Sequence, residues 1–168
     1  MSYVLSFLVV LQIQVLLAQS LNMVLGYSGM LSMSHAAFMG IGAYAAALLA
    51  INFEINILWG FGLAIVLSGI VAMVYGYLTM RLEGDTFILI SFAFQMVVFE
   101  LLLRWSAVTK GVQGVRGIPR PEVFGVALTS LPGFFVLVTV ITVPVIAFML
   151  YLGRSQFGLA IRGIREAE

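Results

Sequence analysis

The first charged side chain in this sequence is Glu54. Every residue before it is neutral, and most are Leu, Val, Ile, Ala, Phe or Met. Over the whole chain 62% of residues are hydrophobic and 9% are charged, whereas soluble domains average about 45–50% apolar and about 25% charged residues. Too few charged side chains remain to cover the surface of a soluble domain of 168 residues. The sequence therefore predicts an integral membrane protein that is surrounded by membrane lipid.

Composition also excludes several classes of function. The net charge is +1 and no continuous basic face is present, so no nucleic acid partner is expected. Cysteine is absent, which excludes disulfides and thiol chemistry. One histidine without cysteine makes no zinc site, and no metal ligand or catalytic residue is predicted. The opening MSYVLSFLVV lacks the positive region of a signal peptide, so the first apolar run is expected to be a retained span.

Five apolar runs are long enough to be transmembrane helices, because a helix needs about 20 residues to cross about 30 Å of hydrocarbon. Helices are the expected spanning element, since lipid tolerates no unpaired backbone. We therefore predict an all-α fold, a polytopic transmembrane helical bundle formed by a single domain over residues 1–168. Its spans cover about residues 3–25, 35–51, 57–80, 86–104 and 133–152, with a loop over 105–132 and a charged segment over 153–168.

The distribution of basic residues gives a weak indication of orientation. Cytoplasmic loops carry an excess of Lys and Arg. With segment 153–168 in the cytoplasm, four basic residues lie inside and three lie outside. The inner set is Arg81, Arg154, Arg162 and Arg165, and the outer set is Lys110, Arg116 and Arg120.

The stretch LGYSGMLSMSH, which begins at Leu25, interrupts the apolar pattern. Gly26 and Gly29 each weaken a helix by about 1 kcal/mol relative to alanine, and serine hydroxyls compete for backbone groups. Irregular backbone at membrane depth is tolerated only where protein or water meets it. We therefore predict a broken or re-entrant segment near residues 26–34 that lines a solute path or its gate. The candidate residues are Asn22, Gly26, Tyr27, Ser28, Gly29, Ser32, Ser34 and His35.

A second interpretation of the same stretch is packing alone. If the helix continues, Ser28, Ser32, Ala36 and Gly40 fall on one face and form a small-residue stripe that lets two helices approach closely. Two roles are open for His35, a hydrogen bond that bridges two helices and a part in the path.

Polar residues in the later spans have structural interpretations. Glu100 and Arg104 are spaced as an i, i+4 ion pair. Gln95 is expected to bridge helices, and Pro144 is expected to bend the last span. The glycines of KGVQGVRGIPRP lack the spacing of a phosphate-binding loop, so this segment is predicted to be a turn-rich external loop. The tail is expected to be a short amphipathic helix at the membrane surface or a docking helix for a soluble partner.

Four segments together resemble the LivM-type permeases, membrane subunits of bacterial ABC importers for branched-chain amino acids and related solutes. LNMVLGYSGMLSMSHAAFMGIGAYAAALL is similar to the N-terminal signature of that family. LTMRLEGDTFILISFAFQMVVFELLLRW resembles its charged turn and following helix, and TKGVQGVRGIPRPEVFG resembles its glycine-rich external loop. GRSQFGLAIRGIREAE is similar to the start of its cytoplasmic ATPase-docking loop. Lys110 stands where the family often has a second glycine.

The resemblance implies a permease subunit without catalysis of its own. Family members continue with further helices, so the chain is expected to be an N-terminal portion that spans the inner (plasma) membrane several times. Its implied partners are a second permease subunit, cytoplasmic ATP-binding subunits and a periplasmic solute-binding protein. No cofactor is expected in this chain, since ATP and Mg²⁺ would be bound by the ATPase. Segment 153–168 would be cytoplasmic, with coupling to the ATPase through Gly158, Arg162, Arg165 and Glu166.

Two other functions are consistent with a polytopic helical protein. A secondary transporter driven by an ion gradient commonly keeps ionisable residues inside its spans, and His35 is the only interior candidate here. A non-transporting membrane scaffold would use the small-residue stripe to assemble partners.

Overall fold

The computed structural model describes residues 2–27, 29–82, 84–123, 126–127, 130–156 and 158. By their internal contacts the residues fall into two compact units. The first unit contains Met1–Ser32 and Leu128–Glu168, and the second contains Met33–Ala127. Each unit is described by itself.

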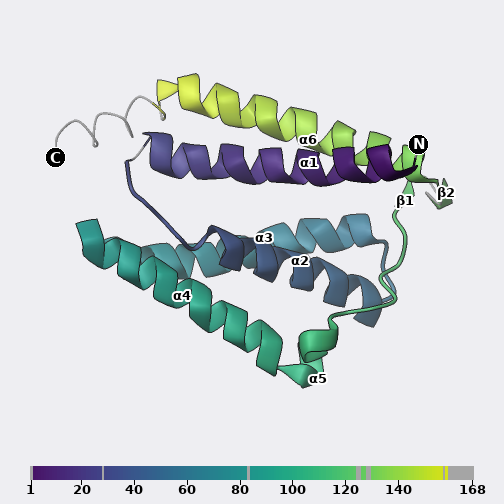
Figure 1. The fold of residues 1–168 in the computed structure, drawn as a ribbon, viewed down its shortest axis with the longest axis horizontal. Coiled ribbons are helices and arrows are strands. Elements are labelled where there is room, and N and C mark those ends of the chain that lie inside the picture. Colours follow the sequence, from purple (N-terminus) through teal and green to yellow (C-terminus); the bar gives the residue numbers. More distant parts are fainter. Residues whose placement is uncertain are drawn as a thin grey trace. The chain divides into compact units, whose positions relative to one another are not determined.

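Five helices in the described residues are long and apolar enough to cross a membrane. They are α1 (Ser2–Asn22, extended by the π-helix Met23–Tyr27), α2 (His35–Asn52), α3 (Ile57–Thr79), α4 (Gly84–Arg104) and α6 (Leu131–Arg154) (Figure 1). The shorter elements are α5 (Ser106–Thr109), a 3₁₀ turn (Gly111–Gln113), and the antiparallel strands β1 (Glu122–Val123) and β2 (Val126–Ala127). The predicted all-α class and its five spans are confirmed, with each span within a few residues of its expected range.

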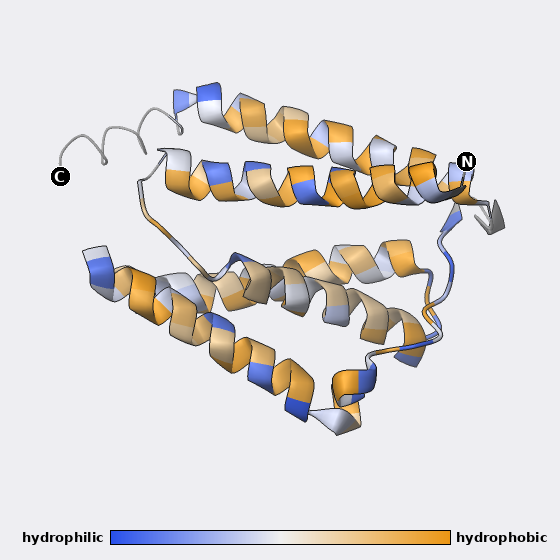
Figure 2. Ribbon diagram, viewed as in Figure 1, coloured by the Kyte–Doolittle hydropathy of each residue, from blue (hydrophilic) through white to orange (hydrophobic). Residues whose placement is uncertain are grey.

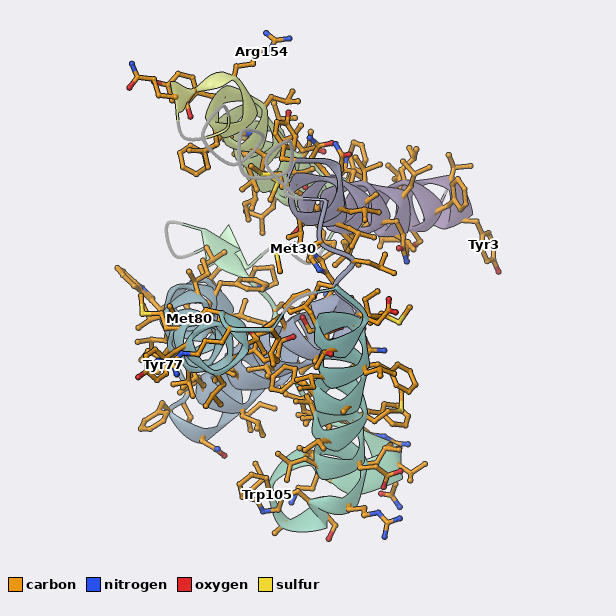
Figure 3. The ribbon with its side chains drawn as sticks, turned by 90° about the vertical axis from the view of Figure 1, so that its left-hand side faces the viewer. Tyr3, Met30, Tyr77, Met80, Trp105 and Arg154 are labelled. Atoms are coloured by element: carbon orange, nitrogen blue, oxygen red, sulfur yellow. The ribbon has the colours of Figure 1, made fainter. Side chains whose placement is uncertain are left out.

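The long helices expose large apolar side chains. Ile65 is 73% exposed and Met73 is 77% exposed on α3, and Tyr3 is 91% exposed on α1. Figure 2 shows hydrophobic positions along most of α1 and α6, and Tyr3 and Tyr77 project away from the ribbon in Figure 3. Water would strongly disfavour this much apolar surface, whereas acyl chains solvate it. The exposed side chains therefore agree with a lipid environment.

In the first unit, α1 and α6 lie side by side and run in the same direction (Figure 1). Near the middle of the pair, Gln12 Nε2 donates a hydrogen bond of 2.8 Å to Thr139 Oγ1. Thr139 Oγ1 in turn donates to the Phe135 carbonyl at 2.8 Å. Further along both helices, Tyr27 reaches Gly153. Because the paired residues advance together along both helices, α1 and α6 enter the membrane from the same side.

In the second unit, α2 packs on α3 through very small residues. Ala45, Ala46 and Ala64 form a buried apolar cluster. Gly60 lies so close to α2 that a Cβ atom there would stand 2.9 Å from the Ala46 carbonyl oxygen. Such a distance permits only glycine at position 60 without a shift of one backbone. The two helices are therefore held by close backbone approach, as is common between membrane helices.

An aromatic cluster joins all three long helices of this unit. The Phe38 ring of α2 meets the Tyr75 ring of α3 edge to face, with ring centroids 5.7 Å apart. Phe94 of α4 lies 5.5 Å from Phe38 and 4.5 Å from Tyr75, again between ring centroids. Aromatic pairs at these separations add about 0.5–1.5 kcal/mol beyond their buried area. The cluster fixes the spacing of α3 and α4 around α2.

The loop before α3 is tied to the loop before α6. Asn56 Nδ2 donates a hydrogen bond to the Glu122 carbonyl, and the Glu122 N–H lies 3.4 Å from Asn56 Oδ1. Asn56 also caps α3 by accepting a hydrogen bond from the Leu58 N–H. Residues 53–56 and residue 122 therefore lie at the same end of the unit, which is where a chain that crosses the membrane at every helix would place both.

The predicted ion pair between Arg104 and Glu100 also forms, on the exposed surface of α4.

We expect Gly60→Ala to destabilise the protein by about 1–3 kcal/mol, since the added methyl group meets backbone rather than a flexible side chain. The measurement is the thermal loss of monodisperse protein in detergent. Gly62→Ala is the matched control on α3, because a Cβ atom there meets nothing within 4 Å. Equal melting temperatures for the two variants would contradict the close packing at Gly60.

Candidate functional site

The first span loses its regular coiling at Asn22. Residues Met23–Tyr27 continue as a π-helix, which is rare and frequently found at functional sites. The Asn22 side chain folds over Gly26, so that a Cβ atom at position 26 would stand 2.5 Å from Asn22 Oδ1. These two predicted path residues are therefore in direct contact, and glycine at position 26 makes room for the amide.

The π-helix ends at Tyr27, and Gly29 has a φ of 73° that other residues rarely adopt. The Gly29 N–H donates a hydrogen bond of 3.1 Å to the Leu25 carbonyl, which satisfies a carbonyl at the end of the helix. Beyond Gly29 the chain stays non-helical to Ser34. The predicted break near residues 26–34 is confirmed, and the alternative of a continuous helical stripe from Ser28 to Gly40 is wrong.

Burial alternates along the non-helical segment. Met30, Leu31 and Met33 are exposed, whereas Ser32 is 8% exposed and Ser34 is 2% exposed. The segment therefore separates its apolar side chains from its hydroxyl groups. Ser28, another predicted path residue, lies outside the described residues.

Ser91 of α4 holds the backbone of this segment in the second unit. The Met33 N–H donates a hydrogen bond of 3.0 Å to Ser91 Oγ, and Ser91 Oγ donates to the Ile88 carbonyl at 2.8 Å. The Ser91 side chain is fully buried. Ser91 follows Gly84, the first residue of α4, by seven positions, which corresponds to about 10 Å along a helix. The non-helical backbone therefore enters the unit two turns along α4, well away from that helix's end.

The helix α2 begins at this level, two turns along α4. Ser34 is the N-cap residue of α2, and its carbonyl accepts a hydrogen bond of 3.2 Å from the Phe38 N–H. His35 is the first helical residue and is half-buried. The first turn of any helix carries N–H groups without helical partners and the positive end of the helix dipole. Ser34 and His35 thus stand at a polar point between apolar helices, and their part in transport stays a prediction.

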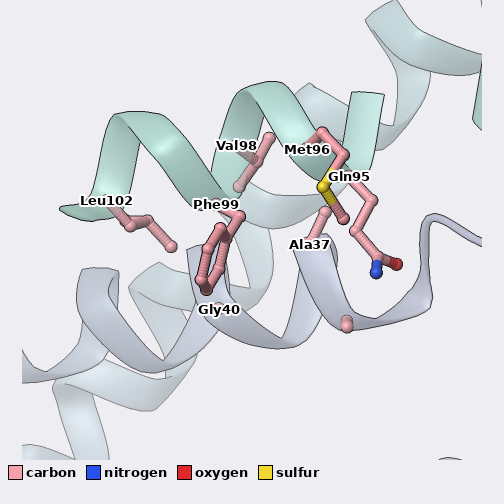
Figure 4. A pocket seen from close by; sticks show the side chains of 8 residues that line it. Ala37, Gly40, Gln95, Met96, Val98, Phe99 and Leu102 are labelled. Atoms are coloured by element: carbon pink, nitrogen blue, oxygen red, sulfur yellow. The ribbon is translucent and has the colours of Figure 1, made fainter. Parts of the chain in front are cut away.

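A groove of about 390 Å³ runs between α2 and α4 (Figure 4). It opens beside the first turns of α2, and Gln95 supplies the only polar side chain among its eight lining residues. Gly40 keeps the groove narrow, because a Cβ atom there would stand 3.0 Å from Leu102 Cδ1. The remaining lining residues are Ala36, Ala37, Met96, Val98 and Phe99. Gln95 lies on the wall of this groove, and its expected bridge to another helix stays a prediction.

The predicted coupling residues are only partly described. Gly158 is described and buried, and it packs on the backbone at Gly153. Arg162, Arg165 and Glu166 lie outside the described residues. Within the described part of the chain, no group of three or more His, Cys, Asp or Glu residues could hold a metal ion.

Two residues of this region were not singled out from the sequence. Ser91 could have been noticed, because it is the only hydroxyl in the apolar run FILISFAF. Gly153 carries no comparable signal, since its importance comes from Tyr27, a residue far away in the chain. Sequence spacing does not reveal such a contact.

Five apolar helices, the first of which gives way to a non-helical segment before the second begins, define a multi-pass membrane protein. A family model described as "Branched-chain amino acid transport system / permease component" matches residues 3–168, and the chain belongs to this family. This membership agrees with the resemblance drawn from the four sequence segments and assigns the chain to the inner membrane.

Two relatives carry the name high-affinity branched-chain amino acid transport system permease protein LivM. The protein from Salmonella typhimurium is 35% identical over 117 residues, and the protein from Escherichia coli is 34% identical over 117 residues. Each match covers 67% of this chain and 27% of the relative. The chain therefore aligns with about a quarter of the length of the curated relatives it matches. No solved structure matches.

We expect Ser91→Ala to destabilise the protein by about 1–3 kcal/mol, because the Met33 N–H loses the acceptor that the buried Ser91 hydroxyl provides. Thermal unfolding in detergent measures the effect. Ser68→Ala is the matched control, since Ser68 Oγ on α3 is buried without a hydrogen-bond partner among the described residues. A loss of stability in Ser68→Ala as large as that in Ser91→Ala would contradict the anchoring role of Ser91.

Proposed function

We propose that this chain belongs to the membrane-spanning permease subunit of an ABC importer. The importer moves branched-chain amino acids or a related small solute across the inner membrane. The chain carries out no catalysis in this proposal, and separate ATPase subunits hydrolyse ATP. Its family and the names of its two relatives support the solute class. The single observation that carries the proposal is the break between α1 and α2, where backbone and hydroxyl groups replace a continuous apolar helix.

The break offers a solute what lipid-facing helices lack. A solute with an ammonium and a carboxylate group loses its hydration when it enters an apolar span, and it needs polar partners there. Unwound backbone near the middle of a membrane is a recurrent way to provide them. In this proposal the path or its gate is formed by Asn22, Gly26, Tyr27, Gly29, Ser32, Ser34 and His35, with Ser28 between them.

The helix directions support one arrangement of partners. With segment 153–168 in the cytoplasm, α6 and its parallel neighbour α1 both run inward. The loop tied to Asn56 then lies outside, where its exposed Lys110, Arg116 and Arg120 would meet a solute-binding protein. The ATPase, which holds ATP and Mg²⁺, would dock on the cytoplasmic tail through Gly158, Arg162, Arg165 and Glu166. A second permease subunit would complete the path.

The test is uptake of radiolabelled leucine into vesicles that contain the chain with its co-purifying subunits. We expect uptake that requires ATP, stops with vanadate and continues when an ionophore removes ion gradients. Uptake that collapses with the ionophore and persists without ATP would instead identify a secondary transporter. Absence of any uptake together with stable binding of other membrane proteins would identify a scaffold.

We expect Ser32→Leu to slow uptake about tenfold, equivalent to about 1.4 kcal/mol, because a large apolar side chain replaces a buried hydroxyl group in the path. Uptake is normalised to the amount of folded protein in the membrane. Ser106→Leu, at an exposed position of the external loop, is the control. If Ser32→Leu reduces folded protein and uptake in equal proportion, the segment has a packing role only.

A further inference from the structure

The end of α6 touches the π-helix at the end of α1, within one compact unit. A Cβ atom at position 153 would stand 2.3 Å from Tyr27 Oη and 2.6 Å from Tyr27 Cζ. The phenol ring of Tyr27 therefore occupies the place of a side chain at Gly153, and Gly153 itself is buried. Any other residue at position 153 would push the ring away. Figure 1 shows these ends of α1 and α6 next to each other.

Gly153 also contacts Gly158, at the start of the tail. A Cβ atom at Gly158 would stand 2.5 Å from the Gly153 carbonyl oxygen and 2.7 Å from the Leu152 carbonyl oxygen. Gly158 is thus packed on the last turn of α6, opposite a backbone that cannot move aside without moving the helix end. Tyr27, Gly153 and Gly158 form a continuous line of contact from the π-helix to the beginning of the charged segment.

The rest of α6 is fixed to α1 at a different level. The hydrogen bond from Gln12 to Thr139 holds the first half of α6. Pro144 follows within the same helix, and it removes a backbone hydrogen bond and weakens the helix at that point. The last turns of α6 can therefore tilt while the first half stays attached. Tyr27 of the π-helix meets those last turns at Gly153.

The π-helix at the end of α1 is suited to respond to a movement of the end of α6. The hydrogen bonds of a π-helix span five residues instead of four, and π-helices occur mostly as single turns within α-helices, frequently at functional sites. Gly29, with its positive φ, lies two residues beyond the end of the π-helix, and the exposed Met30 follows it. A displacement of the Tyr27 ring therefore reaches the broken segment through two residues.

We infer that Tyr27 and Gly153 form a mechanical link that transmits movement of the ATPase-coupled tail to the broken segment after α1. This inference rests on the proposed function, because it needs an ATPase that moves the tail. Tyr27 and Gly153 are positioning residues in it, and neither has to touch the solute. The link connects two groups of residues that the sequence analysis treated separately, the predicted path or gate residues and the predicted coupling residues.

The experiment measures the broken segment directly. The chain has no cysteine, so Met30→Cys introduces one thiol beyond Gly29, and its rate of reaction with a water-soluble maleimide reports exposure there. The rate is compared in the assembled complex without nucleotide and after trapping with ATP and vanadate. We expect a nucleotide-dependent change in the Met30→Cys background. Adding Gly153→Ala should reduce that change at least about fivefold, the lower end of ordinary coupling between sites.

Gly69→Ala is the matched control, because a Cβ atom at that position on α3 meets nothing within 4 Å. Tyr27→Leu is the second variant, since it removes the ring and adds no atom near Gly153. It should also lose the nucleotide-dependent change, and the double variant should lose no more than either single variant, as expected for two residues that act through one contact.

Several outcomes would overturn the link. One is a full nucleotide-dependent change in folded Gly153→Ala or Tyr27→Leu protein, and another is independent, multiplicative losses in the double variant. A third is no change in the Met30→Cys background itself. Leucine uptake, measured on the same preparations, tests the proposed function separately. Absent uptake with an intact labelling change would reject the proposed solute and leave the link supported.

Discussion

The hydrogen bond from the Met33 N–H to Ser91 is the interaction on which this arrangement depends. Peptide groups that leave helical geometry inside a membrane must find partners within the protein, because lipid supplies none. Ser91 meets that requirement two turns into α4, and its own hydroxyl hydrogen is used by the Ile88 carbonyl. With this partner in place, α2 begins beside α4, two turns from the start of that helix.

Small residues then decide how closely the elements approach. Gly60 admits the backbone of α2 at Ala46, and Gly153 admits the ring of Tyr27. The two contacts have different consequences. At Gly60 the neighbour is a rigid carbonyl, so the contact fixes a helix pair. At Gly153 the neighbour is the end of a side chain that can rotate, so the contact is able to change during a cycle. In the proposed transport cycle the first contact would belong to a fixed frame and the second to a movable connection.

Polar side chains within the spans serve as connections between helices. Gln12 and Thr139 join α1 to α6 near their middle, and the tie between Asn56 and Glu122 joins two loops at one end of the second unit. Each of these hydrogen bonds satisfies polar groups for which little or no water is available in or near the membrane interior. Ser34 and His35 hold polar positions at the start of α2, and their part in transport stays a prediction.

The sequence alone determined the number, length and class of the spans, because hydropathy is a local sum and a membrane of fixed thickness selects runs of about 20 apolar residues. It also indicated where a break could occur, since glycine and serine weaken a helix. It left open whether the stretch near Ser28 and Ser32 was a packing stripe or an interruption. Only the tertiary structure decided that question and brought Met33 to Ser91 and Tyr27 to Gly153. Those pairings join residues distant in the chain, and no local pattern encodes the distance at which two helices come to rest.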